Sequence, residues 1–234
     1  AQVLSAQLGV PFEKITLEQN DSDLVRFGNG TGGSRSITAT GQAIVEASAL
    51  VVEKGKKVAA HALEASEGDI EFAGGRFIIA GTDRSIGIME LAQRLREGKV
   101  PEGTPSSLDV DHATKEIVST FPNGCHVAEV EIDPDTGVVQ IVRYNAVNDF
   151  GTVVNPMIVA GQLHGGVAQG IGQALMEEVN YDSSGQPITG SFMDYAMPRA
   201  EDVPMMGIGD HPSPAKTNPL GTKGCGEAGA IGSP

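Results

Sequence analysis

The sequence contains no tryptophan, and aromatic residues make up only 4% of its 234 residues. Glycine, by contrast, occurs 31 times. This composition predicts many tight turns and close approaches between backbone segments, rather than a core of bulky side chains. A chain of this length buries roughly 70% of its unfolded surface, so the size of the core does not limit folding.

Cysteine is also scarce. Cys125 and Cys225 lie far apart in the sequence, at no spacing typical of a zinc site, and two cysteines do not make a disulfide scaffold. A reducing, cytoplasmic compartment is therefore expected. No apolar run reaches about 18 residues, so no membrane-spanning helix is expected. Because the chain has neither a basic leader nor an initiator Met, we expect it to be a piece of a longer subunit.

Positive charge is in deficit. The sequence has 16 lysines and arginines against 30 aspartates and glutamates, which gives a formal net charge of −14. Such a surface repels the phosphate backbone of nucleic acids and the anionic face of a membrane. Neither is an expected partner.

The pattern of apolar residues predicts a mixture of helices and hairpins. Helical spacing occurs in residues 1–10, 41–65, 86–97 and 156–178. Alternating spacing predicts a short strand at 15–17 and two hairpins, which turn at 74–75 and at 133–137. Residues 198–220 are rich in proline and are predicted to be irregular. Because strands and helices do not alternate regularly, we expect an α+β fold over residues 1–234, divisible into subdomains of roughly 1–120 and 121–234.

Three glycine-rich stretches are candidates for a binding site. The first, "GNGTGGSRS" at residues 28–36, precedes a predicted helix and can offer backbone N–H groups to an anion. Ser34 and Ser36 add hydroxyl groups, and Arg35 adds a positive charge suited to phosphate. The stretch lacks the Gly-Lys-Ser/Thr ending of nucleotide hydrolases. Taken alone, it is equally well explained as an ordinary flexible loop.

The second stretch is a predicted helix that begins after Asn155, a favourable N-cap, and Pro156. It contains five glycines, which are Gly161, Gly165, Gly166, Gly170 and Gly172. Together they cost about 4–5 kcal/mol of helix stability relative to alanine. A closely packed backbone or a flat ligand would offset this cost, and Gln162 stands beside the bare face. His164 has no second histidine or cysteine at ligand spacing, so it is interpreted as a surface residue rather than a metal ligand.

The third stretch, "GTKGCGEAGAIGSP" at residues 221–234, is too irregular for a helix and too rich in glycine for a strand. Its backbone can press closely against a ligand and hold Glu227 there. Lys223 stands four residues earlier and can face the same site. The alternative is that both are solvated loop charges.

Five motifs in order resemble the molybdenum-cofactor-binding large subunit of the xanthine dehydrogenase/aldehyde oxidase family, most closely its carbon monoxide dehydrogenase-like branch. These motifs are "AQVLSAQLGVPFEKITL", "GTGGSRSITATGQA", "GCHVAEVEIDPDTG", "NPMIVAGQLHGGVAQGIGQALMEE" and "GTKGCGEAGAIG". The resemblance covers nearly the whole chain. It implies the second molybdopterin-binding domain of that family.

The resemblance also implies roles for particular residues. Glu227 matches the catalytic glutamate, which accepts a proton beside the metal, and Gln162 matches a glutamine that contacts the cofactor. The other matched cofactor-binding residues are Gly33, Ser34, Arg35, Ser36, Lys223 and Gly226. No protein side chain is expected to ligate a metal directly.

The implied cofactor is molybdenum-molybdopterin, in the cytosine dinucleotide form. The implied partners are the upstream part of the same large subunit, an iron–sulfur small subunit, a flavin (FAD) medium subunit and a small-molecule substrate. The fragment alone is then expected to be inactive. Two alternatives stay open: a non-catalytic module in the same fold, and a nucleotide-binding domain unrelated to molybdenum.

Overall fold

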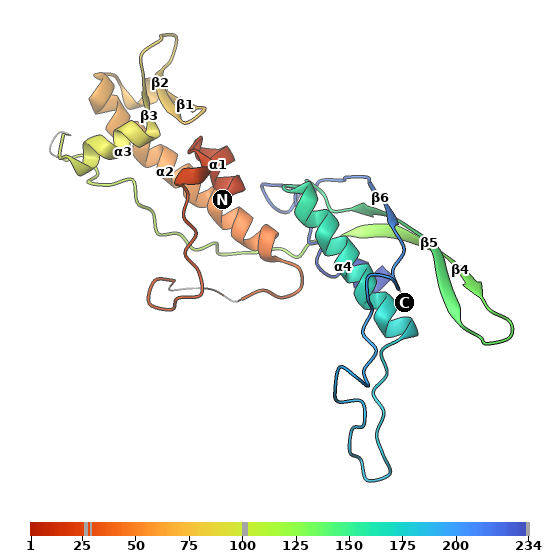
Figure 1. Ribbon diagram of the computed structural model, residues 1–234. Helices are drawn as coiled ribbons and strands as arrows, with labels where there is room; N and C mark the ends of the chain where they lie inside the picture. Colours follow the sequence, from red (N-terminus) through yellow and green to blue (C-terminus); the bar gives the residue numbers. More distant parts are fainter. Residues whose placement is uncertain (26–27, 29, 100–102, 233–234) are drawn as a thin grey trace. The chain divides into compact units, whose positions relative to one another are not determined.

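The computed structural model describes residues 1–25, 28, 30–99 and 103–232. It has an α+β fold, as the sequence predicted, with helices and two small sheets (Figure 1). The chain divides into two compact units. The first contains Ala1–Gly30 and Ala39–Ile117, and the second contains Thr31–Thr38 and Val118–Pro234. Parts of the predicted loops at 20–36 and 98–120, and the last two residues of the terminal stretch, lie outside the described residues.

The helices of the first unit follow the predicted periodicity. They are α1 (Gln2–Leu8), α2 (Ser36–Leu63, whose first residues belong to the second unit) and α3 (Ile88–Arg96), with short 3₁₀ turns at Phe12–Lys14 and Glu67–Asp69. Gly9 ends α1 in the left-handed conformation, with φ 61°. Gly55 does not interrupt α2. A Cβ there would overlap the ring of Phe77, so this glycine lets the helix pack closely on the sheet.

The sheet of the first unit is an antiparallel meander of β1 (Ile70–Ala73), β2 (Arg76–Ile79) and β3 (Ser85–Gly87). The predicted hairpin turn at Gly74 and Gly75 is confirmed, and both glycines have positive φ. Phe77 and Leu91 are fully buried in the core between this sheet and α2 and α3. The strand predicted at residues 15–17 is wrong, because this segment is exposed or half-buried and pairs with no strand among the described residues.

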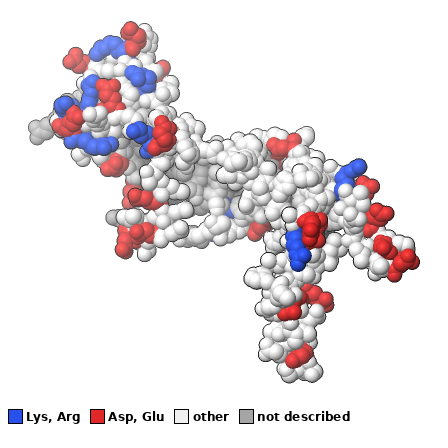
Figure 2. Space-filling model, in the orientation of Figure 1, with Lys and Arg blue, Asp and Glu red and all other residues white. Residues whose placement is uncertain are grey.

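The sheet of the second unit contains β4 (Asn123–Ile132), β5 (Val139–Asp149) and β6 (Met206–Asp210). The predicted β4–β5 hairpin is confirmed. Asp133 Oδ1 accepts hydrogen bonds from the backbone N–H groups of Asp135 and Thr136, at 2.8 and 3.0 Å, and so fixes the turn. Acidic side chains gather at the free end of this hairpin (Figure 2).

Strand β6 pairs in parallel with β5, within the segment predicted to be irregular, and that prediction is wrong for these residues. Two glycines hide the strand pattern in the sequence, Gly207 and Gly209. A Cβ on Gly207 would overlap the amide oxygen of Asn145, and one on Gly209 would lie 3.1 Å from Val147. The glycines therefore let β6 lie close to the side chains of β5.

Two helices complete the second unit, α4 (Pro156–Leu175) and α5 (Ala228–Gly232). The predicted cap is confirmed, since Asn155 Oδ1 accepts a 3.1 Å hydrogen bond from the N–H of Ile158. The core lies between α4 and β5 and consists of Leu163, Val167 and Ile171 with Tyr144, Ala146 and Phe150. None of the helices in the described part of the chain is both long and apolar enough to cross a membrane.

The short helix α5 contradicts the prediction that the terminal stretch is too irregular for a helix. Four of its five residues are glycine or alanine, and its packing against α4 stabilises it. A Cβ on Gly166 of α4 would lie 2.9 Å from the Cα of Gly229 in α5. The predicted close approach along α4 is thus confirmed at Gly166, whereas Gly161 and Gly165 have open space beside them in this chain.

Candidate functional site

The three glycine-rich stretches meet within the second unit. A Cβ on Gly224 would overlap the carbonyl oxygen of Ser34, so the terminal stretch and the 31–38 loop lie backbone against backbone. A Cβ on Gly226 would lie 3.2 Å from Ser34 Oγ and 3.3 Å from Gln162 Nε2. Gly226 therefore lies between α4 and the 31–38 loop, called the serine loop below. A larger residue at this position would push the side chains of Ser34 and Gln162 apart.

Glu227 follows directly and contacts the same loop. Ser34 Oγ donates a 3.0 Å hydrogen bond to Glu227 Oε2. Ser34 and the preceding Gly33 both have left-handed backbones, with φ 53° and 60°. This conformation is unusual for serine and is often found at functional sites. The hydrogen bond joins the first and third stretches through the carboxylate.

The loop continues into the first turn of α2. Thr38 Oγ1 donates to the carbonyl oxygen of Arg35 at 2.9 Å, and the hydroxyls of Thr31 and Ser36 lie 3.0 Å apart. Arg35 and Ser36 themselves are exposed. The loop thus presents a guanidinium group and hydroxyl groups beside the start of a helix, an arrangement that favours an anionic ligand.

A cavity of about 720 Å³ lies beside these groups. It is lined by residues 32–35 of the serine loop, residues 119–122, Glu227, Ala228 and Ile231. Glu227 and Arg35 bring opposite charges to its wall, while Phe121, which is 73% exposed, brings an apolar ring. Sequence reasoning missed residues 119–122 because they lie in an extended segment with no distinguishing pattern.

A second cavity of about 310 Å³ adjoins the same helix α5. His126, in its wall, joins two buried side chains of β5: its Nδ1 lies 3.0 Å from the Tyr144 hydroxyl, and its Nε2 lies 3.1 Å from Asn148 Oδ1. A Cβ on Gly232 would lie 2.7 Å from His126 Nδ1. Sequence reasoning did not single out this polar cluster, which contacts α5 through His126 and Gly232.

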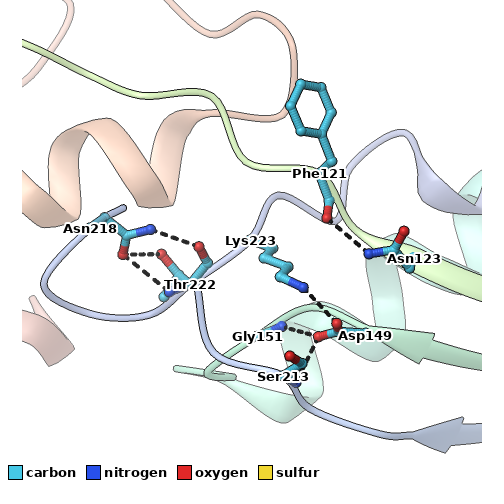
Figure 3. Close-up of polar contacts among 8 residues, drawn as sticks. All are labelled: Phe121, Asn123, Asp149, Gly151, Ser213, Asn218, Thr222 and Lys223. Atoms are coloured by element: carbon cyan, nitrogen blue, oxygen red, sulfur yellow. Dashed lines mark hydrogen bonds and ion pairs between the residues drawn. The ribbon is translucent and has the colours of Figure 1, made fainter. Parts of the chain in front are cut away.

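Lys223 does not line the larger cavity. Its ammonium group forms a 2.5 Å ion pair with Asp149 Oδ2 (Figure 3). Burial on its own would raise the pKa of Asp149. The hydrogen bonds from Lys223 and from the N–H groups of Ser213 and Gly151 outweigh that effect and hold the pKa below its ordinary value.

Two further candidates have ordinary explanations. His164 Nδ1 lies 2.7 Å from the carbonyl oxygen of Ala160 within α4, and among the described residues no group of three or more His, Cys, Asp or Glu could hold a metal ion. Cys225 packs against the core of the second unit, and burial raises the pKa of its thiol. The thiol is therefore poorly suited to act as a nucleophile.

Comparison with known proteins identifies the family. Residues 1–204 match the family described as the molybdopterin cofactor-binding domain. The chain belongs to this family. The molybdopterin-binding domain is 37% identical to the 6-hydroxypseudooxynicotine dehydrogenase complex subunit gamma of Paenarthrobacter nicotinovorans, over 99% of the chain and 29% of that protein. It is 34% identical to the carbon monoxide dehydrogenase large chain of Hydrogenophaga pseudoflava, over 100% of the chain and 29% of that protein.

Solved structures agree. The domain superposes on the Cu,Mo-CO dehydrogenase with a TM-score of 0.90 and 33% identity, over 99% of this chain and 29% of that one. Quinoline 2-oxidoreductase from Pseudomonas putida 86 gives a TM-score of 0.86 and 35% identity, over 99% of this chain and 30% of that one. The resemblance noted in the sequence is confirmed, and the chain spans less than a third of the length of these relatives.

Proposed function

We propose that this domain binds molybdopterin as its cytosine dinucleotide in the larger cavity, and that Glu227 is the catalytic base of a molybdenum hydroxylase. The observation that carries the proposal is the convergence of Ser34, Gln162 and Glu227, from three distant stretches, around Gly226. A solvated tail would not be expected to bring these three residues together. The names of the relatives, which include several dehydrogenases, support an oxidoreductase activity for the complete protein.

The residues of the serine loop fit an anionic cofactor. Arg35 is exposed and can pair with phosphate through two N–H groups at once. Ser34 and Ser36 offer hydroxyl groups, and the left-handed backbone at Gly33 lets the loop turn beside the cavity. Gln162 does not line the cavity itself, but its exposed amide lies beside Gly226, next to Ser34, and can donate to or accept from a pterin that extends past Ser34. The Lys223 ammonium, in contrast, is already paired with Asp149.

When bound, the cofactor would supply two-electron redox chemistry, and the protein would position the substrate and move a proton. Glu227 is exposed and lines the cavity, so its carboxylate can reach a proton there. The hydrogen bond from Ser34 uses one of about four acceptor positions on a carboxylate. The bond therefore orients Glu227 and leaves it able to act as a base.

The complete protein would act within a complex. We propose that the rest of the large chain, an iron–sulfur subunit and an FAD subunit complete it, in a reducing cytoplasm that the two free cysteines favour. Large apolar side chains on the second unit support the presence of a partner. Phe192, Met193 and Met205 are 88%, 92% and 94% exposed.

Metal and nucleotide analysis of the complete purified assembly tests this proposal. We expect stoichiometric molybdenum and, after acid hydrolysis, stoichiometric cytidine monophosphate. Molybdenum without a nucleotide, or with guanosine monophosphate, would contradict the cytosine dinucleotide form. Absence of molybdenum from protein produced by cells able to make the cofactor would contradict the whole proposal and favour a non-catalytic module.

A further inference from the structure

The carboxylate of Asp149, at the end of β5, gathers three donors (Figure 3). Its Oδ2 accepts from the Lys223 ammonium at 2.5 Å. Its Oδ1 accepts from the backbone N–H groups of Gly151 and Ser213, each at 2.9 Å. The side chains of Lys223 and Asp149 are only 12% and 15% exposed. One carboxylate thus joins the end of β5 to two later segments of the chain.

Lys223 is anchored through its backbone as well. Its N–H donates to the carbonyl oxygen of Phe150 at 2.9 Å, and the neighbouring Thr222 is almost fully buried. Asn218 brackets Thr222, because its amide Nδ2 donates to the Thr222 carbonyl oxygen and its Oδ1 accepts from the Thr222 N–H. The chain is therefore held firmly up to Lys223.

No backbone hydrogen bond of residues 224–226, which lie beside Ser34, is seen within the described part of the chain. Gly224 lies against the backbone of Ser34, where only glycine fits, and Gly226 lies close to the side chains of Ser34 and Gln162. Glycine provides close approach but no stiffness. Apart from the packing of Cys225 on the core, the backbone that leads to Glu227 therefore depends on anchors at its two ends. One is Lys223, and the other is α5, which is packed on α4 through Gly229.

We propose that Asp149 and Lys223 are positioning residues for Glu227. The ion pair fixes the start of the glycine-rich segment, so the carboxylate of Glu227 reaches the cavity at a defined place. This inference rests on the function proposed for Glu227. It gives Lys223 a role different from direct contact with the cofactor, because its ammonium group is directed into a largely buried pair.

Removal of one partner tests the role, since it leaves the other charge buried and uncompensated. In the complete enzyme we compare Lys223→Met with Lys223→Arg, which keeps the charge, and with Lys216→Met, a control at an exposed lysine. Lys223→Met is expected to keep its molybdenum content and to lose kcat on the order of 10- to 100-fold, with little change in KM. Lys223→Arg is expected to recover most of that kcat, and Lys216→Met to match the wild type.

A double variant separates positioning from general damage. In a Glu227→Gln background, Lys223→Met is expected to cause no further loss in single-turnover rate, because the group that it positions is already gone. The same fold-loss in that background would overturn the proposal, as would wild-type kcat in Lys223→Met. Loss of molybdenum from Lys223→Met would also overturn it and would indicate a cofactor ligand.

A second variant covers the case in which Lys223→Met does not fold. If Lys223→Met does not accumulate, Asp149→Asn replaces it with the same expected results, because asparagine retains an acceptor for the N–H groups of Gly151 and Ser213. If Glu227 is not the catalytic base, the pattern of turnover among the variants is different. Full turnover in Glu227→Gln alone would refute the base assignment, whereas an inactive Glu227→Gln with a fully active Lys223→Met would refute only the positioning role.

Discussion

Gly166 of α4 and Gly229 of α5 pack backbone against backbone. A Cβ on Gly229 would lie 2.7 Å from the carbonyl oxygen of Leu163, and one on Gly166 would lie 2.9 Å from the Cα of Gly229. Neither position has room for a side chain. Because α5 begins at Ala228, this contact sets the position of the helix that follows Glu227 directly.

Gly166→Val is therefore expected to destabilise the complete large chain by about 1–3 kcal/mol and to lower its molybdenum content. Chemical denaturation and metal analysis check both effects. Gly165→Ala is the matched control, since nothing lies within 4 Å of its Cβ position in this chain. That variant should be neutral or more stable by up to about 1 kcal/mol. Equal stability of the two variants would contradict the packing argument.

Gly224→Ala places a methyl group on the carbonyl oxygen of Ser34. The variant should separate the serine loop from the terminal stretch and so reduce the bound molybdenum and nucleotide several-fold. Gly190→Ala serves as the control, because this exposed glycine has open space around it. Full cofactor content in Gly224→Ala would show that the two backbones do not need to touch.

Arg35→Gln removes the positive charge from the wall of the larger cavity. If this arginine binds the phosphate groups, the variant should retain less cytidine nucleotide than the wild type after dialysis at low salt. The difference should shrink as salt concentration rises, because salt screens the attraction that the variant lacks. Arg143→Gln is an informative comparison. Arg143 is also exposed, but it lies 3.7 Å from Glu129 in an ion pair on the β4–β5 hairpin. Identical retention in both variants would refute the phosphate role.

Glu46 ties an extended segment to α2 in the first unit. The pKa of its carboxyl is lowered, first by the hydrogen bond with His112 and then by those from Gln42 and Thr114. A lowered folded-state pKa stabilises the fold above the unfolded value of about 4.3, and this contribution is lost as pH falls through the folded value. As pH falls through the folded pKa, we therefore expect the midpoint of thermal unfolding to fall, because the hydrogen bonds of Glu46 with His112 and Thr114 are lost.

Glu46→Gln should lower the midpoint of thermal unfolding already at pH 7, and this midpoint should change less on acidification than that of the wild type. Glu53→Gln is the control, since Glu53 is well exposed and pairs with Lys56 on the helix surface, at 3.2 Å. A wild-type midpoint in Glu46→Gln at pH 7 would contradict the role of this carboxylate.

The elements that could be predicted from sequence are those with local signals. The apolar spacing within 41–65 and 86–97 is repeated over several turns, and the two hairpins carry their own turn residues. Helix α5 and strand β6 lack such signals. Their glycines are favourable only because α4 and β5 lie beside them, and a linear pattern does not contain that information.

The site shows the same division. Unusual glycine content pointed to all three stretches that converge, because glycine has a cost that something must offset. The ion pair between Asp149 and Lys223 could not be predicted, since no local sequence pattern around either residue indicates that the two are in contact. The return of residues 31–38 to the second unit is equally invisible to a division of the chain near residue 120.

Glu227→Gln in the complete enzyme is the most direct test of the proposed base. Glutamine keeps the size of the side chain and an acceptor for the hydrogen bond from Ser34, but it cannot take up the proton. We expect molybdenum and nucleotide content equal to that of the wild type and of the exposed control Glu178→Gln, with kcat lower by on the order of 10²- to 10⁴-fold. Turnover within a few-fold of wild type at full molybdenum content would contradict the account.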